Sequence, residues 1–215
     1  MAAMEPAPIL PPRPGEFAFE LTGGALCLDF ANTLDNRGRP SPRELLHTFP
    51  QFVGWSRQAG ALSGGQAAAL LRRVARRSAA ARATLRRATV LREAIYRIFS
   101  ACAEHRAAPP TDLTLFNAAA ANAFHNLRVG RSRRGFVWDW EDDPAALDRM
   151  LWPVLRSAAN LLTSPELERV RVCASRTCGW LFLDHSKNGS RRWCNMKICG
   201  NRAKVRQFYK RHHAS

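Results

Sequence analysis

The chain has 215 residues, of which 46% are hydrophobic and 23% charged, a composition that excludes a wholly disordered protein. No run of 18 apolar residues occurs, so we expect no membrane-spanning helix. The formal net charge of +16 favours polyanionic partners such as DNA, RNA or an anionic membrane surface. GC-rich coding DNA also enriches arginine without any functional meaning, and this alternative stays open.

Residues 1–15 are rich in proline and predict a disordered leader. They lack the basic start and apolar segment of a secretory signal. The expected compartment is therefore the cytoplasm, where cysteines serve metals rather than disulfides. Phe17 and Phe19 alternate with polar residues before Gly23-Gly24, which predicts a short hairpin. Residues 26–30 fit either a strand or the start of a helix, and residues 36–43 read as a loop.

Helical periodicity and capping signals dominate the next 120 residues. They predict helices over residues 45–59 (broken or restarted at Pro50), 63–77 (capped by Ser63), 79–105, 111–124 (capped by Thr111 or Asp112) and 144–162 (opened by Pro144). In the longest helix, one apolar stripe contains Leu91, Ile95, Ile98, Phe99 and Cys102, and most arginines lie off it on a solvated face. Residues 127–140 alternate around a Gly/Arg/Ser turn and predict a β-hairpin, with Trp138 and Trp140 on one face.

Four cysteines near the C-terminus are arranged as two closely spaced pairs. They are Cys173, Cys178, Cys194 and Cys199, with four residues inside each pair and 15 between the pairs. Four soft thiolates favour Zn²⁺ and close its coordination shell, which predicts one structural zinc. The alternative is buried or disulfide-bonded cysteines, which two symmetrical pairs make less favourable. Cys27 and Cys102 read as thiols of the core.

The last quarter of the chain is strongly basic. Residues 169–215 contain 12 Lys or Arg and a single acidic residue, Asp184. We expect a helix after Cys199 whose apolar side, with Val205, Phe208 and Tyr209, packs on the zinc module. Its other side would bind phosphates or read guanine; the alternative is a polar face needed only for folding. The candidate nucleic-acid contacts are Arg191, Arg192, Asn201, Arg202, Lys204, Arg206, Lys210 and Arg211.

Cys199-Gly200-Asn201-Arg202 resembles the signature of the CGNR zinc finger. Neighbouring residues match too: Cys178-Gly179-Trp180, Phe182-Leu183-Asp184, Ser186-Lys187-Asn188, Arg191-Arg192-Trp193-Cys194 and Ala203-Lys204. Residues 24–33, Leu91–Ile95 and the AANLL of 158–162 resemble the ABATE domain that precedes this finger. The resemblance implies stress-induced transcription regulators. The expected fold is mainly α with small β-hairpins (α+β): a helical domain at 16–165, then a treble-clef-like zinc finger with four cysteine ligands at 168–213.

The favoured function is a DNA-binding transcription regulator of the cytoplasm and nucleoid, with the helical domain as sensor of a small-molecule effector or as homodimerisation unit. The alternatives are a zinc-stapled protein adaptor and an RNA binder. An enzyme is not expected: Asp184-His185 resembles part of an HNH nuclease, but the CGNR pattern does not fix residue 185. Asp29 and Asn32 lie three positions apart, so on a helix they would share a face and contact a small ligand, or more simply anchor local backbone.

Overall fold

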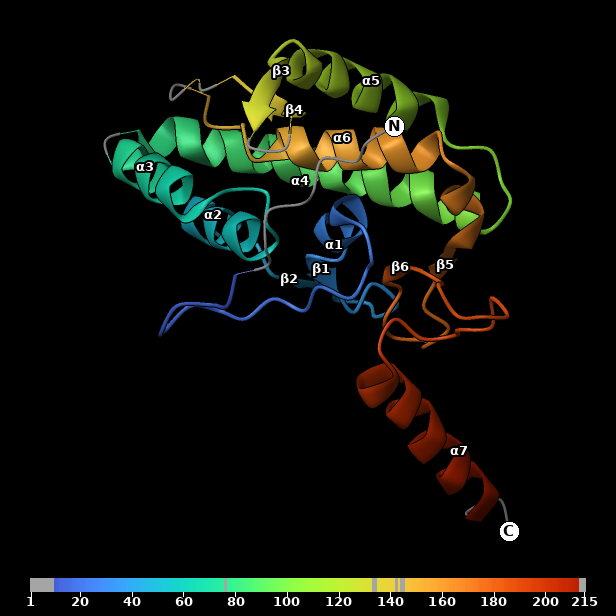
Figure 1. Ribbon diagram of the computed structural model, residues 1–215. Coiled ribbons are helices and arrows are strands. Elements are labelled where there is room, and N and C mark those ends of the chain that lie inside the picture. Colours follow the sequence, from blue (N-terminus) through green and yellow to red (C-terminus); the bar gives the residue numbers. More distant parts are fainter. Residues whose placement is uncertain (1–9, 76, 133–134, 142, 144–145, 213–215) are drawn as a thin grey trace.

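The computed structural model describes residues 10–75, 77–132, 135–141, 143 and 146–212, without the side chains of Lys210 and Arg211. Within these ranges, helices surround one large core, and a final helix, α7, projects away from it (Figure 1). None of the helices described is long and apolar enough to cross a membrane.

The N-terminal elements are α1 (Leu26–Ala31), β1 (Leu34–Asp35), β2 (Arg43–Glu44), α2 (Phe49–Gln58) and α3 (Gly64–Val74). Of these elements, α1, β1 and β2 lie below the long helices in Figure 1, and α2 and α3 lie at the left end of α4 (Ser78–Ala103). Thr48 and Ser63 cap α2 and α3 through reciprocal capping boxes with Gln51 and Gln66, which confirms the predicted Ser63 cap. Pro50 lies in the first turn of α2, where its missing N–H costs nothing.

The 26-residue helix α4 (Ser78–Ala103) is the centre of the fold. Leu91, Ile95, Ile98 and Phe99 are at most 4% exposed, as the apolar stripe predicts. Four later elements follow it: α5 (Pro110–Phe124), which packs against α4, the antiparallel pair β3 (Leu127–Ser132) and β4 (Gly135–Trp140), and α6 (Leu151–Leu162), which packs against α5 and α1. The base of the hairpin joins the core through Trp140, whose ring centroid lies 5.8 Å from that of Trp152.

The C-terminal elements are a 3-10 turn at Pro165–Arg169, β5 (Val170–Val172), β6 (Leu181–Leu183), one π-helical turn at Met196–Gly200 and α7 (Asn201–His212). The strands β5 and β6 pair antiparallel, with Val170 opposite Leu183. Val170, Leu181 and Leu183 are at most 3% exposed and belong to the same core as the long helices. We call the helices α1 to α6 the helical body and the predicted zinc-finger segment at 168–213 the finger. The finger is therefore joined to the helical body through the strand pair β5–β6.

Three local predictions were wrong or incomplete. Residues 16–22 form no strand, because the side chain of Gln58 bonds the backbone of Phe17 and Phe19 in place of a partner strand. Neither Thr111 nor Asp112 caps α5, since Asp112 accepts two hydrogen bonds from Arg97. The last long helix begins at Leu151, and its predicted start, Pro144, lies outside the described residues.

Of the two predicted core thiols, Cys27 is fully buried, and burial raises its pKa to about 12. Cys102 is only partly buried at the end of the α4 stripe. The predicted leader lies mostly outside the described residues.

Candidate metal centre and nucleic-acid interface

The four cysteines of the C-terminal segment converge on one point. Their Sγ atoms all lie within 4.8 Å of one another, and each residue is buried. The Sγ atoms of Cys178 and Cys194 are 3.6 Å apart, and those of Cys194 and Cys199 are 3.8 Å apart. A tetrahedral zinc with Zn–S bonds of about 2.3 Å places its sulfurs about 3.8 Å apart. The donor set and its spacing therefore fit one Zn²⁺ ion.

The four thiols of the cluster strongly perturb one another's ionisation. Hydrogen bonds from the thiols of Cys178 and Cys194 hold the pKa of Cys173 well below its ordinary value. A thiolate at Cys173 in turn raises the pKa of Cys178 and Cys194. Four thiolates can coexist in so small a space only when a cation neutralises them, and Zn²⁺ bound by four cysteines is a closed structural site.

The first cysteine pair lies in the turn between β5 and β6. Cys173 N–H donates to the Trp180 carbonyl at 2.8 Å, and Cys178 N–H donates to the Ser175 carbonyl at 3.0 Å. We call residues 173–180 the first knuckle. Gly179 has φ +72°, a left-handed conformation that glycine adopts without strain. Gly179 therefore lets the chain turn at the end of the knuckle and enter β6.

The loop after β6 is held by Asp184, whose side chain is buried. Its carboxylate accepts hydrogen bonds from Ser186 N–H at 2.8 Å and Arg191 N–H at 2.9 Å. Burial raises the pKa of Asp184, but these hydrogen bonds outweigh it and hold the pKa below its usual range. The strand β6 pairs with β5, whose valines face the core, and not with residues 191–193; residues 184–191 form a loop around Asp184.

Arg191 stabilises the inside of the finger. Its guanidinium lies 4.5 Å above the Phe182 ring and donates to the carbonyls of Trp193, at 2.9 Å, and Cys194. Arg192 is exposed, and its guanidinium lies 5.4 Å from the centre of the Trp193 ring. Of these two predicted nucleic-acid contacts, Arg192 therefore has the more accessible cation.

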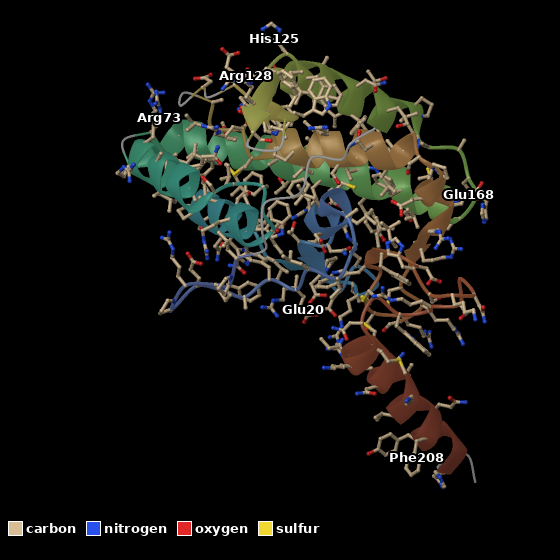
Figure 2. The ribbon with its side chains drawn as sticks, in the orientation of Figure 1. Glu20, Arg73, His125, Arg128, Glu168 and Phe208 are labelled. Carbon is tan, nitrogen blue, oxygen red and sulfur yellow. The ribbon has the colours of Figure 1, made fainter. Side chains whose placement is uncertain are left out.

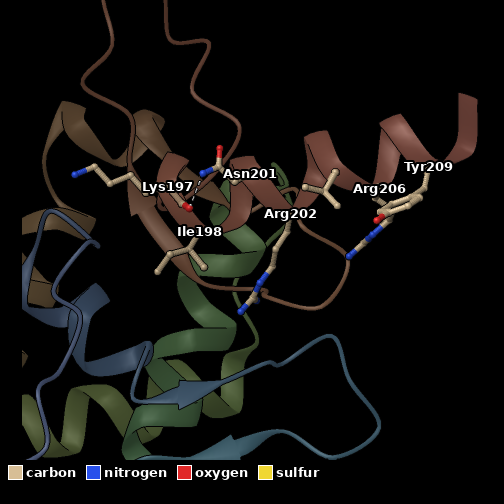
Figure 3. Close-up of a pocket in the computed structure, with 7 residues that line it drawn as sticks. Lys197, Ile198, Asn201, Arg202, Arg206 and Tyr209 are labelled. Carbon is tan, nitrogen blue, oxygen red and sulfur yellow. Dashed lines mark hydrogen bonds between the residues drawn. The ribbon is translucent and has the colours of Figure 1, made fainter. Parts of the chain in front are cut away.

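The second cysteine pair leads directly into α7. Asn195 caps the π-helical turn by accepting from Lys197 N–H at 2.9 Å, and Asn201 Nδ2 donates to the Lys197 carbonyl at 3.0 Å (Figure 3). An open groove of about 560 Å³ runs along this end of the finger. It is lined by Lys197, Ile198, Asn201, Arg202, Val205, Arg206 and Tyr209. We call these seven residues the groove face.

The expected packing of α7 on the zinc module was wrong. Val205, Phe208 and Tyr209 are 54%, 59% and 56% exposed, and Figure 2 shows Phe208 far from the helical body. Arg202, Lys204 and Arg206 are exposed on the same helix. The four-cysteine cluster fixes the start of α7, because Cys199 lies in the π-helical turn Met196–Gly200 and this turn continues directly into the helix. The helix is thus presented to solvent on both its cationic and its apolar sides.

Asp29 and Asn32 both bond protein backbone. Asp29 Oδ1 accepts from Gly23 N–H at 2.8 Å, and burial raises the pKa of its carboxyl to about 7. Asn32 is 2% exposed, and its side chain bonds both backbone groups of Leu181 in β6. These contacts agree with the anchoring alternative, and a small ligand at this pair stays an untested prediction.

Sequence reasoning missed Arg37 and Tyr96, which lie against the first knuckle. Arg37 N–H donates to the Cys178 carbonyl at 2.9 Å, and Tyr96 Oη donates to the Gly179 carbonyl at 2.9 Å. The side chains also meet each other, with the Arg37 guanidinium 3.7 Å from the centre of the Tyr96 ring. No spacing rule links positions 37, 96 and 178, so only the fold shows this contact.

Four clustered cysteines between a strand pair and a helix define a zinc finger, here carried on a helical body. Residues 169–212 match the model of the CGNR zinc finger. Residues 24–165 match that of ABATE, described as "Putative stress-induced transcription regulator". The chain belongs to the ABATE family and ends in a CGNR zinc finger. No curated protein matches the chain.

Proposed function

We propose that this protein is a transcription regulator that binds double-stranded DNA through α7 and the basic residues beside it. The observation that carries the proposal is a basic helix left open to solvent: Arg202, Lys204 and Arg206 are exposed on α7. Residues 185–215 contain no Asp or Glu, so no acidic side chain of this segment opposes a phosphate backbone.

The shape of α7 favours duplex DNA over duplex RNA. An α-helix with its side chains is about 10–12 Å across, and the major groove of B-DNA is about 12 Å wide. The major groove of A-form RNA is too narrow to admit side chains for base reading. Arg202, Arg206 and Tyr209 follow one another at helical spacing on the groove face, so they would enter the DNA together.

In this proposal Arg202, Lys204, Arg206, Lys210 and Arg211 contact phosphates or guanines, and Asn201 lies at the start of the reading helix. Arg192 extends the cationic surface from the loop. Arg191 contributes mainly by holding the finger together, since its guanidinium bonds the Cys194 and Trp193 carbonyls. The helical body would serve as the sensor or oligomerisation unit, and the protein would reside on the nucleoid.

A protein-adaptor function is the second candidate, because Val205, Phe208 and Tyr209 are all more than half exposed. On DNA such side chains would contact thymine methyl groups, whereas on a protein they would enter an apolar groove. The two functions differ in their dependence on salt. Phosphate binding weakens steeply as counterions are added, and apolar docking does not.

The test is fluorescence anisotropy of the full chain on a random 30-base-pair duplex, with duplex RNA beside it and selection from a random DNA pool as a follow-up. We expect zinc-loaded protein to bind the DNA more tightly than chelator-treated protein at the same salt. Equal affinity in both states would mean that charge alone acts, and the regulator proposal would be abandoned. The absence of salt-sensitive binding to either nucleic acid would favour the adaptor.

A further inference from the structure

The two cysteine pairs of the zinc centre belong to different parts of the molecule. Cys173 and Cys178 lie between β5 and β6, which share the core of the helical body. Cys194 lies two residues before the π-helical turn Met196–Gly200 that leads into α7, and Cys199 lies within that turn. A zinc ion held by all four would join the body to the projecting helix.

The body reaches the first knuckle through two hydrogen bonds to consecutive carbonyls. Arg37 N–H donates to Cys178, and Tyr96 Oη donates to Gly179, both at 2.9 Å. The approach is close enough to exclude side chains at two glycines. A Cβ on Gly38 would lie 2.1 Å from the Arg176 carbonyl oxygen, and one on Gly179 would lie 2.9 Å from Arg37 Cβ.

The donors on the body are themselves held in place. The Arg37 side chain is 8% exposed and donates from Nη1 to Glu93 Oε2 at 2.7 Å and from Nη2 to the Ala31 carbonyl at 2.8 Å. Its guanidinium covers the Tyr96 ring, so the arginine and the tyrosine fix each other. Glu93 and Tyr96 lie on adjacent turns of α4, the central helix of the core. The contact is therefore rigid on the body side.

We infer that Arg37 and Tyr96 are positioning residues of the zinc centre, so that the helical body governs how firmly the first cysteine pair holds the ion. Outer partners of metal ligands orient them, and their loss typically weakens metal binding ten- to a hundredfold. Here these partners come from α4 and the loop after β1, and Tyr96 lies 83 positions before Gly179 in the sequence. The inference does not rest on nucleic-acid binding.

The experiment measures zinc release from the full chain to a coloured chelator, at a temperature well below thermal unfolding. Tyr96→Phe removes one hydroxyl, and Glu93→Gln loosens Arg37 without touching the knuckle. We expect release to be roughly tenfold faster in Tyr96→Phe and faster than wild type in Glu93→Gln. Thr89→Val is the matched control on the same helix, because its hydroxyl bonds the Arg86 carbonyl at 2.9 Å, away from the zinc.

A second control separates positioning from general stability. Ile98→Val weakens the core packing of α4 and is used at a temperature where its unfolded fraction equals that of Tyr96→Phe. Faster release in Tyr96→Phe and Glu93→Gln than in Ile98→Val supports the inference. Wild-type release in both Tyr96→Phe and Glu93→Gln overturns it, as does equally fast release in Ile98→Val. An independent readout is hydrogen exchange of the Arg37 amide, which should accelerate on zinc removal; unchanged exchange would also contradict the inference.

Discussion

Asn32 and Leu181 lie 149 positions apart and are joined by two hydrogen bonds. Asn32 Nδ2 donates to the Leu181 carbonyl at 2.8 Å, and Leu181 N–H donates to Asn32 Oδ1 at 2.9 Å. The Asn32 side chain therefore bonds β6 in the way that the backbone of a third strand would, along the edge of β6 that faces away from β5. Leu183 N–H extends this edge by donating to the Gly23 carbonyl at 2.8 Å.

We predict that Asn32→Ala destabilises the whole chain, because it leaves two buried backbone groups of Leu181 without partners. Such groups cost about 1–3 kcal/mol when unpaired. Urea unfolding followed by circular dichroism measures the loss. Asn126→Ala is the control, since its side chain bonds the Asn122 carbonyl at an exposed helix end. Equal stability of Asn32→Ala and wild type would contradict the role given to this pair.

Cys199→Ser should lose the zinc, because three thiolates no longer close the site. We expect about one zinc per wild-type chain by elemental analysis, and far less in the variant. Cys102→Ser changes a thiol outside the cluster and should keep its zinc. Zinc retained equally by both variants would rule out the four-cysteine site.

Replacing Arg202 and Arg206 together by glutamine should reduce the salt dependence of DNA binding. Each phosphate contact contributes a log–log slope of about −0.9, so losing two flattens the slope by about two units. Binding isotherms at several salt concentrations give the slope. The double variant Arg82→Gln, Arg86→Gln removes the same charge from exposed positions of α4 and should leave the slope unchanged. A slope that responds equally in both would place the binding surface elsewhere.

Asp29 should make stability depend on pH. Burial raises its folded-state pKa to about 7, whereas an unfolded aspartate titrates near 4. The folded state therefore binds the proton of Asp29 more tightly than the unfolded state does. This proton binding contributes fully to stability below about pH 4, and the contribution is lost as the pH rises to about 7. Asp29→Asn keeps an acceptor for Gly23 N–H and should be more stable than wild type at pH 8. Thermal melts from pH 5 to 8 test this, and an unchanged pH profile in the variant would refute it.

Local patterns predicted much of this molecule. The zinc cluster follows from cysteine spacing, since two close pairs need only one loop to bring them together. The stripe of Leu91, Ile95 and Ile98 predicted the buried face of α4 because helical period and burial share one geometry. The hairpin at 127–140 was equally readable from its alternation around a turn.

Contacts between distant segments were not predictable. A three-residue strand such as β5 has too few positions to show a period, so its pairing with β6 was missed. The exposure of α7 was missed for another reason: Val205, Phe208 and Tyr209 give the same amphipathic pattern whether the helix packs on its own protein or on something else. The sequence around Arg37 and Tyr96 shows no pattern that predicts their role, since that role depends on the position of the first knuckle in the folded chain.

Because the finger and the helical body share one core, the finger is not an independent module that can be moved unchanged to another protein. Val170, Leu181 and Leu183 of the finger are buried in the same core as α1 and α4, so an excised finger would expose three apolar side chains and an unpaired strand edge. Grafting this finger onto another protein would require the recipient to supply a counterpart of Asn32 and an apolar surface for Val170, Leu181 and Leu183. Under the proposed function, DNA specificity would accordingly be easier to exchange by replacing residues of α7, whose Val205, Phe208 and Tyr209 are exposed, than by replacing the whole finger.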